Sequence, residues 1–339
     1  MEQLNISRRS FLAAAGTAVA AGLGLTACGG SGAGAGASAG SAAGSAAASG
    51  TTYKIGVIQL VEHSALDAAN KGFVKALKES GLDVKIDQQN AQNDQSAAQT
   101  IANKFVSDGD DLIFAIATPA AQAAAGATTD IPIVGTAITD FAESGLVKSN
   151  DKPETNVTGT SDLTPVAEQL DMLHEVLPDA KTVGLLYASN EANSKIQIDM
   201  AKKELDKLGV SYEEFSVSSS NEVQSVVESA VSKINALYAP TDNTIAAAAA
   251  QVGQIALENK IPFIAGEEGM FKDGKGLFTL SIDYTDLGYQ AGEMAVKILK
   301  GESKPQDMAI ETTPKDKLKV LKNEDVAKEL GIDLSPLDK

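Results

Sequence analysis

The sequence of 339 residues has few of the side chains on which most catalytic, metal and nucleic-acid sites depend. It contains no Trp, one Cys and two His, which excludes an intramolecular disulfide, a thiolate-rich zinc site and a multi-histidine metal centre. Its only Arg residues are Arg8 and Arg9, and 45 acidic against 28 basic side chains give a net charge of −17. Because nucleic acids are bound through basic surface, this composition argues against a nucleic-acid partner.

The first 27 residues have the pattern of an export signal. The paired Arg residues precede an apolar stretch of small residues, 13–27, in the usual order of charged start, apolar core and cleavage region. The pair resembles the twin-arginine signal of bacteria, and Leu25-Thr26-Ala27-Cys28 resembles the lipobox of bacterial lipoproteins. A membrane-spanning helix is the alternative, but about 15 residues fall short of the roughly 20 that it needs. We expect residues 1–27 to be removed and Cys28 to carry lipid.

A linker follows the expected lipidation site. All 22 residues from 29 to 50 are Gly, Ala or Ser, a composition that cannot bury a core and behaves as a flexible coil. Its root-mean-square reach is roughly 25 Å. We therefore expect residues 28–52 to hold an extracytoplasmic domain just off the membrane, anchored by the lipid on Cys28.

Beyond the linker, short apolar runs alternate with stretches whose apolar residues recur at helical spacing. The pattern predicts strands at 55–60, 84–87, 111–117, 131–135, 183–187, 211–217, 236–240, 261–265 and 277–282. It predicts helices at 65–80, 94–107, 119–127, 193–208, 221–233, 243–259 and 286–300. Strands separated by such helices indicate βαβ units around a parallel sheet.

This alternation of strands and helices occurs twice, with a sequence period of about 130 residues. Ile55-Gly56-Val57-Ile58 parallels Val183-Gly184-Leu185-Leu186, and Ile131-Pro132-Ile133-Val134 parallels Ile261-Pro262-Phe263-Ile264. A period this long indicates two similarly built domains rather than a solenoid. We expect an α/β fold of two doubly wound parallel-sheet lobes that share a crevice at their strand ends, where such sheets bind ligands.

Polar side chains gather directly after the predicted strands. With no Arg in this region, a ligand carboxylate would rest on hydroxyls and on backbone N–H groups at helix N-termini, and a ligand ammonium on carboxylates. This mixture fits a zwitterionic small molecule. The expected ligand-binding residues are Glu62, His63, Thr118, Thr136, Ser189, Asn193, Thr241, Asp242, Asn243, Glu267 and Asp283. Each of these residues could instead be only a helix N-cap. This alternative is strongest for Thr118, for Asp242 and for Ser64, which follows His63 in the sequence.

The residue types at these positions are compatible with two other chemistries. Glu62 and His63 could form an acid/base pair, but no Ser elbow, activated Cys or paired-carboxylate motif accompanies them. Glu267 and Glu268 could hold a divalent cation, but no neighbouring Asp or His completes such a site. We expect no catalytic residue, no metal and no cofactor.

Several motifs together resemble the substrate-binding lipoproteins of ABC importers of the tryptophan/tyrosine type, over about residues 53–331. They are Glu62-His63-Ser64-Ala65-Leu66-Asp67, Ala117-Thr118-Pro119-Ala120-Ala121-Gln122, Gly159-Thr160-Ser161-Asp162, Pro240-Thr241-Asp242-Asn243 and Ala265-Gly266-Glu267-Glu268-Gly269. The family is similar to type I periplasmic-binding proteins, whose two α/β lobes are joined by three hinge strands. The resemblance implies crossings near 155–162, 281–284 and 304–313. It places 53–160 with about 284–304 in the first lobe, and 161–283 with about 305–339 in the second.

The resemblance implies a binding protein that closes over its ligand and delivers it to the permease of an ABC importer. An aromatic amino acid is the favoured ligand, and Tyr284, Met270, Phe141, Leu66 and Leu60 are candidates for its apolar walls. A nucleoside or sugar is the first alternative, although the missing Trp and Arg count against a sugar site. An extracytoplasmic enzyme using Glu62 and His63 is the second. A monomer is expected.

Overall fold

The computed structural model of this protein describes residues 51–338, which belong to one compact unit. The expected export signal, Cys28 and nearly all of the linker lie outside these described residues. None of the helices in residues 51–338 combines the length and the hydrophobicity that a membrane span requires. The α/β fold of parallel sheets expected from the sequence is confirmed.

The first lobe is built on a six-stranded sheet in the order β11-β5-β4-β3-β1-β2, with every neighbouring pair parallel. Its strands are β1 (Tyr53–Gln59), β2 (Val84–Asn90), β3 (Leu112–Ile116), β4 (Ile133–Ile138), β5 (Val157–Ser161) and β11 (Glu311–Thr312). Its helices are α1 (Ser64–Glu79), α2 (Gln95–Asp108), α3 (Thr118–Ala127) and α10 (Tyr284–Leu299). Every residue of β3, β4 and β5 is buried, because helices cover both faces of such a sheet.

The second lobe is built on a four-stranded parallel sheet in the order β7-β6-β8-β9. Its strands are β6 (Thr182–Ala188), β7 (Ser211–Val217), β8 (Ala236–Ala239) and β9 (Phe263–Ala265), and an antiparallel pair, β10 (Phe278–Ser281) and β12 (Lys319–Lys322), lies beside them. Its helices are α4 (Val166–Val176), α5 (Ala192–Leu208), α6 (Val223–Ala230), α7 (Asn243–Ala247), α8 (Ala249–Glu258), α9 (Glu268–Asp273) and α11 (Glu324–Leu330). Four 3₁₀ turns complete the described chain: η1 (Ser220–Glu222), η2 (Pro305–Asp307), η3 (Lys315–Lys317) and η4 (Ser335–Leu337).

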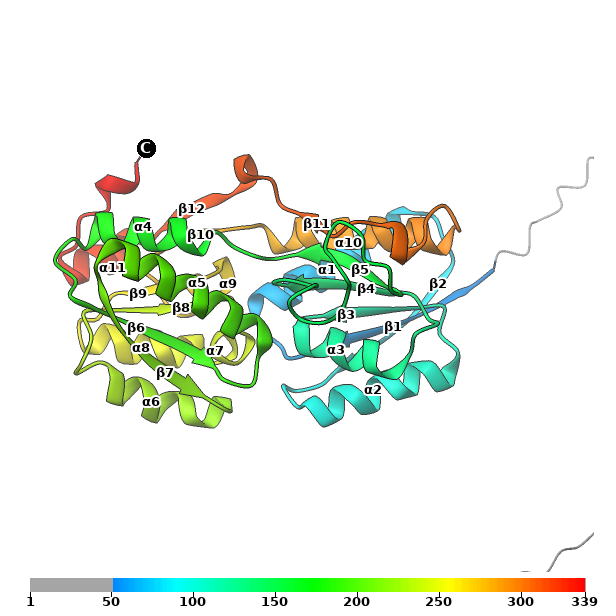
Figure 1. The fold of residues 1–339 in the computed structure, drawn as a ribbon, viewed down its shortest axis with the longest axis horizontal. Helices are drawn as coiled ribbons and strands as arrows, with labels where there is room; N and C mark the ends of the chain where they lie inside the picture. Colours follow the sequence, from blue (N-terminus) through cyan, green and yellow to red (C-terminus); the bar gives the residue numbers. More distant parts are fainter. Residues whose placement is uncertain (1–50, 339) are drawn as a thin grey trace, which may run out of the picture. The chain divides into compact units, whose positions relative to one another are not determined.

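Three segments connect the lobes, as Figure 1 shows along its upper edge. The chain passes from β5 to α4, from β10 to α10, and from β11 to β12. Because the six-stranded and the four-stranded sheet each contain only parallel pairs, the carboxyl ends of the strands in each lie at one edge, and the loops that follow them gather there.

The third crossing differs from the sequence expectation, which placed residues from about 305 onward with the second lobe. In the structure, β11 pairs with β5, and the backbone N–H of Ile310 donates to the carbonyl of Asn150 at 2.8 Å. Residues up to Thr312 therefore lie against the first sheet. A strand of two exposed residues carries no periodic pattern that a sequence could reveal.

Several other elements differ in extent from expectation: strand β2 runs on to Asn90, strand β9 begins only at Phe263, and two helices and strand β4 differ as follows. The helix expected at 243–259 is divided into α7 and α8 at Ala248, whose φ of −109° and ψ of 11° leave the helical region. The helix expected at 221–233 begins as η1 and ends earlier. Strand β4 continues past residue 135 through a bulge at which Ala137 takes a φ of 54°. Thr136 is consequently inside the strand rather than in the loop after it.

Candidate functional site

The loops after the strands of the two lobes touch each other. His63 of the first lobe lies 3.4 Å from Asn243 of the second, measured from Nε2 to Oδ1. Deeper in the interface, Thr139 of the first lobe accepts a hydrogen bond of 3.1 Å from the amide of Gln197 and lies 3.4 Å from the Thr241 hydroxyl. All three of these deeper side chains are buried. The two lobes are thus closed on each other around a polar interface.

Asp242 organises the second lobe's side of this interface. One carboxylate oxygen accepts the N–H of Ile245 at 2.8 Å and so caps α7, while the other accepts Ala188 N–H at 2.6 Å and the Ser194 hydroxyl at 2.7 Å. Burial, and secondarily the charge of Glu191, raise the pKa of Asp242 above its usual range. Both oxygens are therefore occupied by donors of the same lobe. The bond from Ile245 makes Asp242 the N-cap of α7, which is the structural alternative given above for this residue.

Glu191 is a second buried carboxylate at this edge, and it was not among the residues expected from the sequence. Its oxygens accept from both nitrogens of Asn243 (3.2 and 2.5 Å), both donors of Thr244 (3.0 and 2.8 Å) and the amide of Asn193 (3.2 Å). It is 2% exposed and no Lys lies against it in the described chain. Its place in the loop after β6 was the available signal, but nothing in the sequence marks five donors converging on it.

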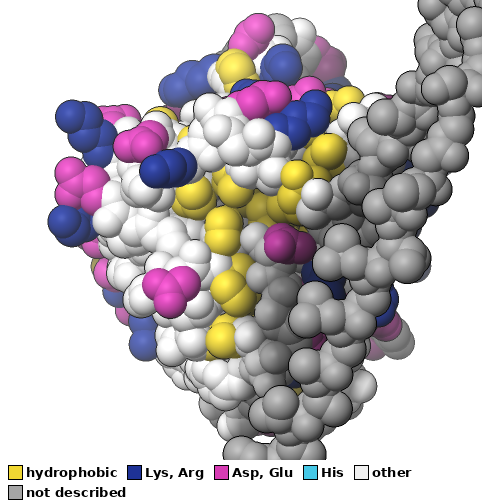
Figure 2. Space-filling model, turned by 90° about the vertical axis from the view of Figure 1, so that its right-hand side faces the viewer, with side chains coloured by type: hydrophobic (Ala, Val, Ile, Leu, Met, Phe, Trp, Pro, Cys, Tyr) yellow, Lys and Arg dark blue, Asp and Glu magenta, His cyan; other side chains and the backbone are white. Residues whose placement is uncertain are grey.

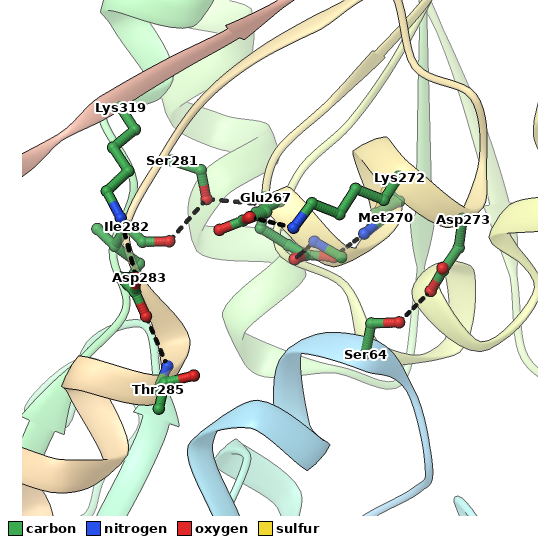
Figure 3. A network of polar contacts seen from close by, with 12 residues as sticks. Ser64, Glu267, Met270, Lys272, Asp273, Ser281, Ile282, Asp283, Thr285 and Lys319 are labelled. Carbon is green, nitrogen blue, oxygen red and sulfur yellow. Dashed lines mark hydrogen bonds and ion pairs between the residues drawn. The ribbon is translucent and has the colours of Figure 1, made fainter. Parts of the chain in front are cut away.

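Glu267 and Asp162 occupy the side of the interface near the connecting segments. Glu267 caps α9 by accepting the N–H groups of Gly269 and Met270, as Figure 3 shows. Asp162 accepts the hydroxyl of Tyr284 at 2.9 Å. Burial raises the pKa of Glu267 to about 7 and that of Asp162 to about 6, although hydrogen bonds oppose the shift in both.

The raised pKa of Glu267 predicts a pH-dependent stability. A group whose pKa is higher in the folded state stabilises the fold fully below its ordinary pKa, and this contribution is lost as the pH rises through about 7. The Glu267 contribution to the free energy of unfolding should therefore fall by about 2.5 kcal/mol between pH 5 and pH 8. The free energy of unfolding, measured with urea at pH 5 and at pH 8, should differ less between the two pH values for Glu267→Gln than for the wild type. A Glu→Gln change at the exposed Glu62 should keep the wild-type difference, and an unaltered profile in Glu267→Gln would contradict the assignment.

Three buried side-chain atoms near this interface have no hydrogen-bond partner within residues 51–338. They are Oγ1 of Thr118, Nδ1 of His63 and Oδ1 of Asn193. Asn193 directs its Nδ2 toward the carbonyl of Thr241 and the Glu191 carboxylate, which fixes the amide orientation and leaves the oxygen unpaired. These atoms follow three different strands, β3, β1 and β6, and helix α3 contacts α5 across the interface.

The hydrogen bonds of His63 also fix its tautomer. Asn243 uses its Nδ2 to bond Glu191, so its Oδ1 faces the imidazole and His63 Nε2 must be the donor. Nδ1 is then an acceptor. Burial lowers the pKa of His63, which favours this neutral form. Glu62 is exposed and makes no bond to His63, so the two do not form the acid/base pair considered above.

The remaining expected residues do not join this interface in the same way. Thr136 bonds Thr160 at 2.8 Å inside the first sheet, and Ser189 bonds the carbonyl of Val217 at 3.1 Å. Asp283 caps α10 and pairs with Lys319 at 2.9 Å (Figure 3). Four of the expected apolar walls, Leu60, Leu66, Phe141 and Tyr284, belong to the core of the first lobe, and Met270 belongs to a core of the second.

One surface cavity lies away from the polar interface. It measures about 990 Å³ and is lined by residues before β4 and β5, such as Pro132 and Asn156, and by Lys304 after α10. The amino ends of β4 and β5 therefore border this cavity. Figure 2 shows the face of the molecule on the right of Figure 1, where apolar side chains form a band among charged ones. Within residues 51–338, no group of three or more His, Cys, Asp or Glu is arranged to hold a metal ion. Other buried unpaired atoms, such as Asp110 Oδ2 and Thr279 Oγ1, lie elsewhere in the described chain. The three that follow strands β1, β3 and β6 are the ones placed where parallel sheets bind ligands, and they mark the candidate site.

Comparison with known proteins supports a binding role for such a site. The family model of the ABC transporter substrate binding protein matches residues 54–336. A tyrosine-binding protein of Clostridioides difficile (strain R20291) is 50% identical over 253 residues, which are 74% of this chain and 73% of that protein.

Solved structures are also similar to this chain. An ABC domain from Streptococcus pneumonia in complex with L-Trp has a TM-score of 0.81 and 40% identity, over 85% of this chain and 98% of that one. The ligand-free, open structure of a substrate binding protein with adhesive properties from Clostridium difficile has a TM-score of 0.63 and 50% identity, over 83% and 95%. From its matched family model, its relatives and its two lobes closed on a polar interface, this chain belongs to the substrate-binding proteins of ABC transporters.

Proposed function

We propose that this protein is the extracytoplasmic, lipid-anchored binding protein of an ABC importer and that it binds an aromatic amino acid, tyrosine or tryptophan. The observation that carries the proposal is the set of three buried, unpaired atoms on Thr118, His63 and Asn193. The 50% identical tyrosine-binding protein and the 40% identical L-Trp complex supply the ligand class.

The chemistry of the three atoms fits the charged end of an amino acid. The Thr118 hydroxyl can donate to a carboxylate, and it stands at the first turn of α3, where no side chain caps the helix. The N–H groups of an uncapped helix N-terminus attract an anion. Ala117, just before this helix, has a φ of 86°, a strained value for a residue with a Cβ and one that is enriched at functional sites. We assign the ligand carboxylate to this position.

The ligand ammonium requires acceptors, and the second lobe and His63 provide them. Asn193 Oδ1 and His63 Nδ1 are both acceptors without a donor. The sequence offers four acids for this role, Glu62, Asp242, Glu267 and Asp283. Asp242 and Glu267 already accept donors of their own lobe. Asp283 caps α10 and pairs with Lys319, and Glu62 is exposed. We therefore assign the ammonium to Asn193 and His63, so that one ligand contacts both lobes and favours their closed arrangement.

The arrangement of the lobes supports a closed, ligand-competent state. The more similar relative, at 50% identity, is an open, ligand-free structure and superposes less well, with a TM-score of 0.63. The less similar one, at 40% identity, is an L-Trp complex and reaches 0.81. If sequence divergence set the TM-scores, the 50% identical structure would have the higher one. We therefore attribute the lower TM-score of the open structure to a different arrangement of its lobes. Closed lobes are the form that we propose the membrane permease receives.

The remaining parts of the proposal rest on the N-terminal sequence. The twin-Arg and lipobox-like patterns support export and lipid attachment at Cys28. The mature chain is strongly acidic, so attraction to anionic lipids cannot replace that lipid. A lipid anchor keeps the binding protein beside its permease.

Isothermal titration after removal of co-purified ligand tests the proposed ligand. L-tyrosine and L-tryptophan should bind with micromolar or lower Kd. Tyramine, which lacks the carboxylate, and 3-(4-hydroxyphenyl)propionate, which lacks the ammonium, should each bind at least about 100-fold more weakly, because each leaves buried polar groups unpaired. Since the protein contains no Trp, bound L-tryptophan also gives the only indole fluorescence. Binding of a nucleoside or sugar, with no response to any amino acid, would refute the proposal.

A further inference from the structure

Among the hydrogen bonds that join the two lobes, one connects the loop after β2 to helix α7. The amide Nδ2 of Asn93, in the loop after β2, donates to the Thr244 hydroxyl of α7 at 2.9 Å. Asn93 and the preceding Gln92 both have positive φ values, 60° and 53°, and Asn93 N–H is bonded to the carbonyl of Leu60 at 2.8 Å. The loop is thus held in an unfavourable backbone conformation that presents Asn93 to the opposite lobe.

The second lobe's side of this contact is held by Glu191. Its carboxylate accepts both the backbone N–H and the hydroxyl of Thr244, at 3.0 and 2.8 Å. Since the hydroxyl proton points to Glu191, the oxygen is left to accept from Asn93. The same carboxylate accepts from Asn193 at 3.2 Å and so helps to leave that amide oxygen free for a ligand.

We propose that Glu191 is a positioning residue that couples the ligand-facing amide of Asn193 to the closing contact between Thr244 and Asn93. The inference rests on the proposed function and adds a residue that does not itself touch the ligand. The apparent affinity of such a protein falls with the fraction of molecules able to close, so loss of the Asn93–Thr244 contact weakens binding without changing a ligand contact.

A second hydrogen bond between the lobes serves as the control for the Asn93–Thr244 bond, because Glu191 takes no part in it. The Ser64 hydroxyl, at the start of α1, donates to Asp273 of α9 at 2.5 Å, and Figure 3 shows both side chains. This bond also joins the two lobes, and within residues 51–338 neither Ser64 nor Asp273 is hydrogen-bonded to Glu191. Coupling of Glu191 to Asn93 but not to Ser64 is therefore the specific consequence of the proposal.

Double-mutant cycles on the ligand Kd test it, read by titration of the full mature chain with L-tyrosine. Glu191→Gln should weaken binding about 10- to 100-fold and Asn93→Ala about 3- to 10-fold. In the Glu191→Gln background, Asn93→Ala should have almost no further effect, whereas Ser64→Ala should keep its full effect. If Asn93→Ala raises the Kd by the same factor in the Glu191→Gln background as in the wild type, the two residues are not coupled and the inference is overturned.

A second cycle covers the case in which Glu191→Gln does not fold. Thr244→Val removes the hydroxyl that both Glu191 and Asn93 use, and it should abolish the effect of Asn93→Ala but not that of Ser64→Ala. If the wild type binds neither tyrosine nor tryptophan, the proposed ligand is wrong. The same cycles are then read with the ligand that mass spectrometry identifies on natively purified protein, and additive effects there overturn the inference independently.

Discussion

Thr118→Val is expected to weaken the binding of L-tyrosine or L-tryptophan by about 10- to 100-fold while leaving the fold intact. Thr118 is 1% exposed, and its hydroxyl has no partner in residues 51–338. A hydrogen bond to a charged group contributes about 1.5–3 kcal/mol, and here its loss would leave the ligand carboxylate incompletely paired. Val has nearly the same shape as Thr, so the change in Kd measured by titration reports the hydroxyl itself.

Two controls define this result. Thr118→Ser keeps a hydroxyl at the same helix terminus and should stay within a few-fold of the wild-type Kd. Thr136→Val removes a buried hydroxyl whose bond to Thr160 lies inside the first sheet, so it should lower the melting temperature without weakening the ligand comparably. Equal losses of affinity in Thr118→Val and Thr136→Val would mean that the effect comes from the sheet and not from a ligand contact.

Gly288→Ala is expected to destabilise the protein by about 3 kcal/mol or more, the largest effect that we expect on folding. A Cβ at Gly288 of α10 would lie 1.9 Å from the carbonyl oxygen of Ala69 in α1. The partner position repeats the constraint, because a Cβ at Gly72 of α1 would lie 2.0 Å from the carbonyl of Thr285. Both obstacles are backbone atoms, so the two helices would have to separate. Overpacking of side chains alone usually costs about 1–3 kcal/mol.

The same substitution elsewhere provides the control. Gly126 lies in α3, is exposed, and a Cβ there would meet only a Gln99 side-chain oxygen at 3.6 Å. Gly126→Ala should therefore be neutral or stabilising by up to about 1 kcal/mol, because Ala favours a helix. Urea unfolding of both variants measures the difference. Similar stabilities for Gly288→Ala and Gly126→Ala would show that α1 and α10 are not held at backbone contact.

The order of strands and helices could be predicted closely because it depends on local pattern. Strand β7 has the expected limits, and α2, α5 and β6 differ from expectation by one residue at each end or fewer. What escaped prediction had weak or misleading local signals. The break at Ala248 lies within a run of Ala residues that favours an unbroken helix, and β11 depends on pairing with a distant strand.

The candidate site was predictable in place but not in detail. The rule that ligands bind after the strands of parallel sheets drew attention to His63, Thr118, Asn193 and Asp242. This rule could not distinguish Asp242 from Thr118. The Asp242 carboxylate accepts three hydrogen bonds, whereas the Thr118 hydroxyl has no hydrogen-bond partner in the described chain. Glu191 was missed for the same reason, since its five donors come from residues up to 53 positions away.

The amino-acid sequence by itself determined the two-lobed plan, the resemblance to importer binding proteins and the absence of Arg from any ligand site, because composition and hydrophobic spacing are properties of the chain. Only the tertiary structure decided which strand-end groups satisfy one another and which stay unpaired. That decision depends on hydrogen-bond geometry between distant segments at the closed interface, and a buried polar atom is costly unless it finds a partner there.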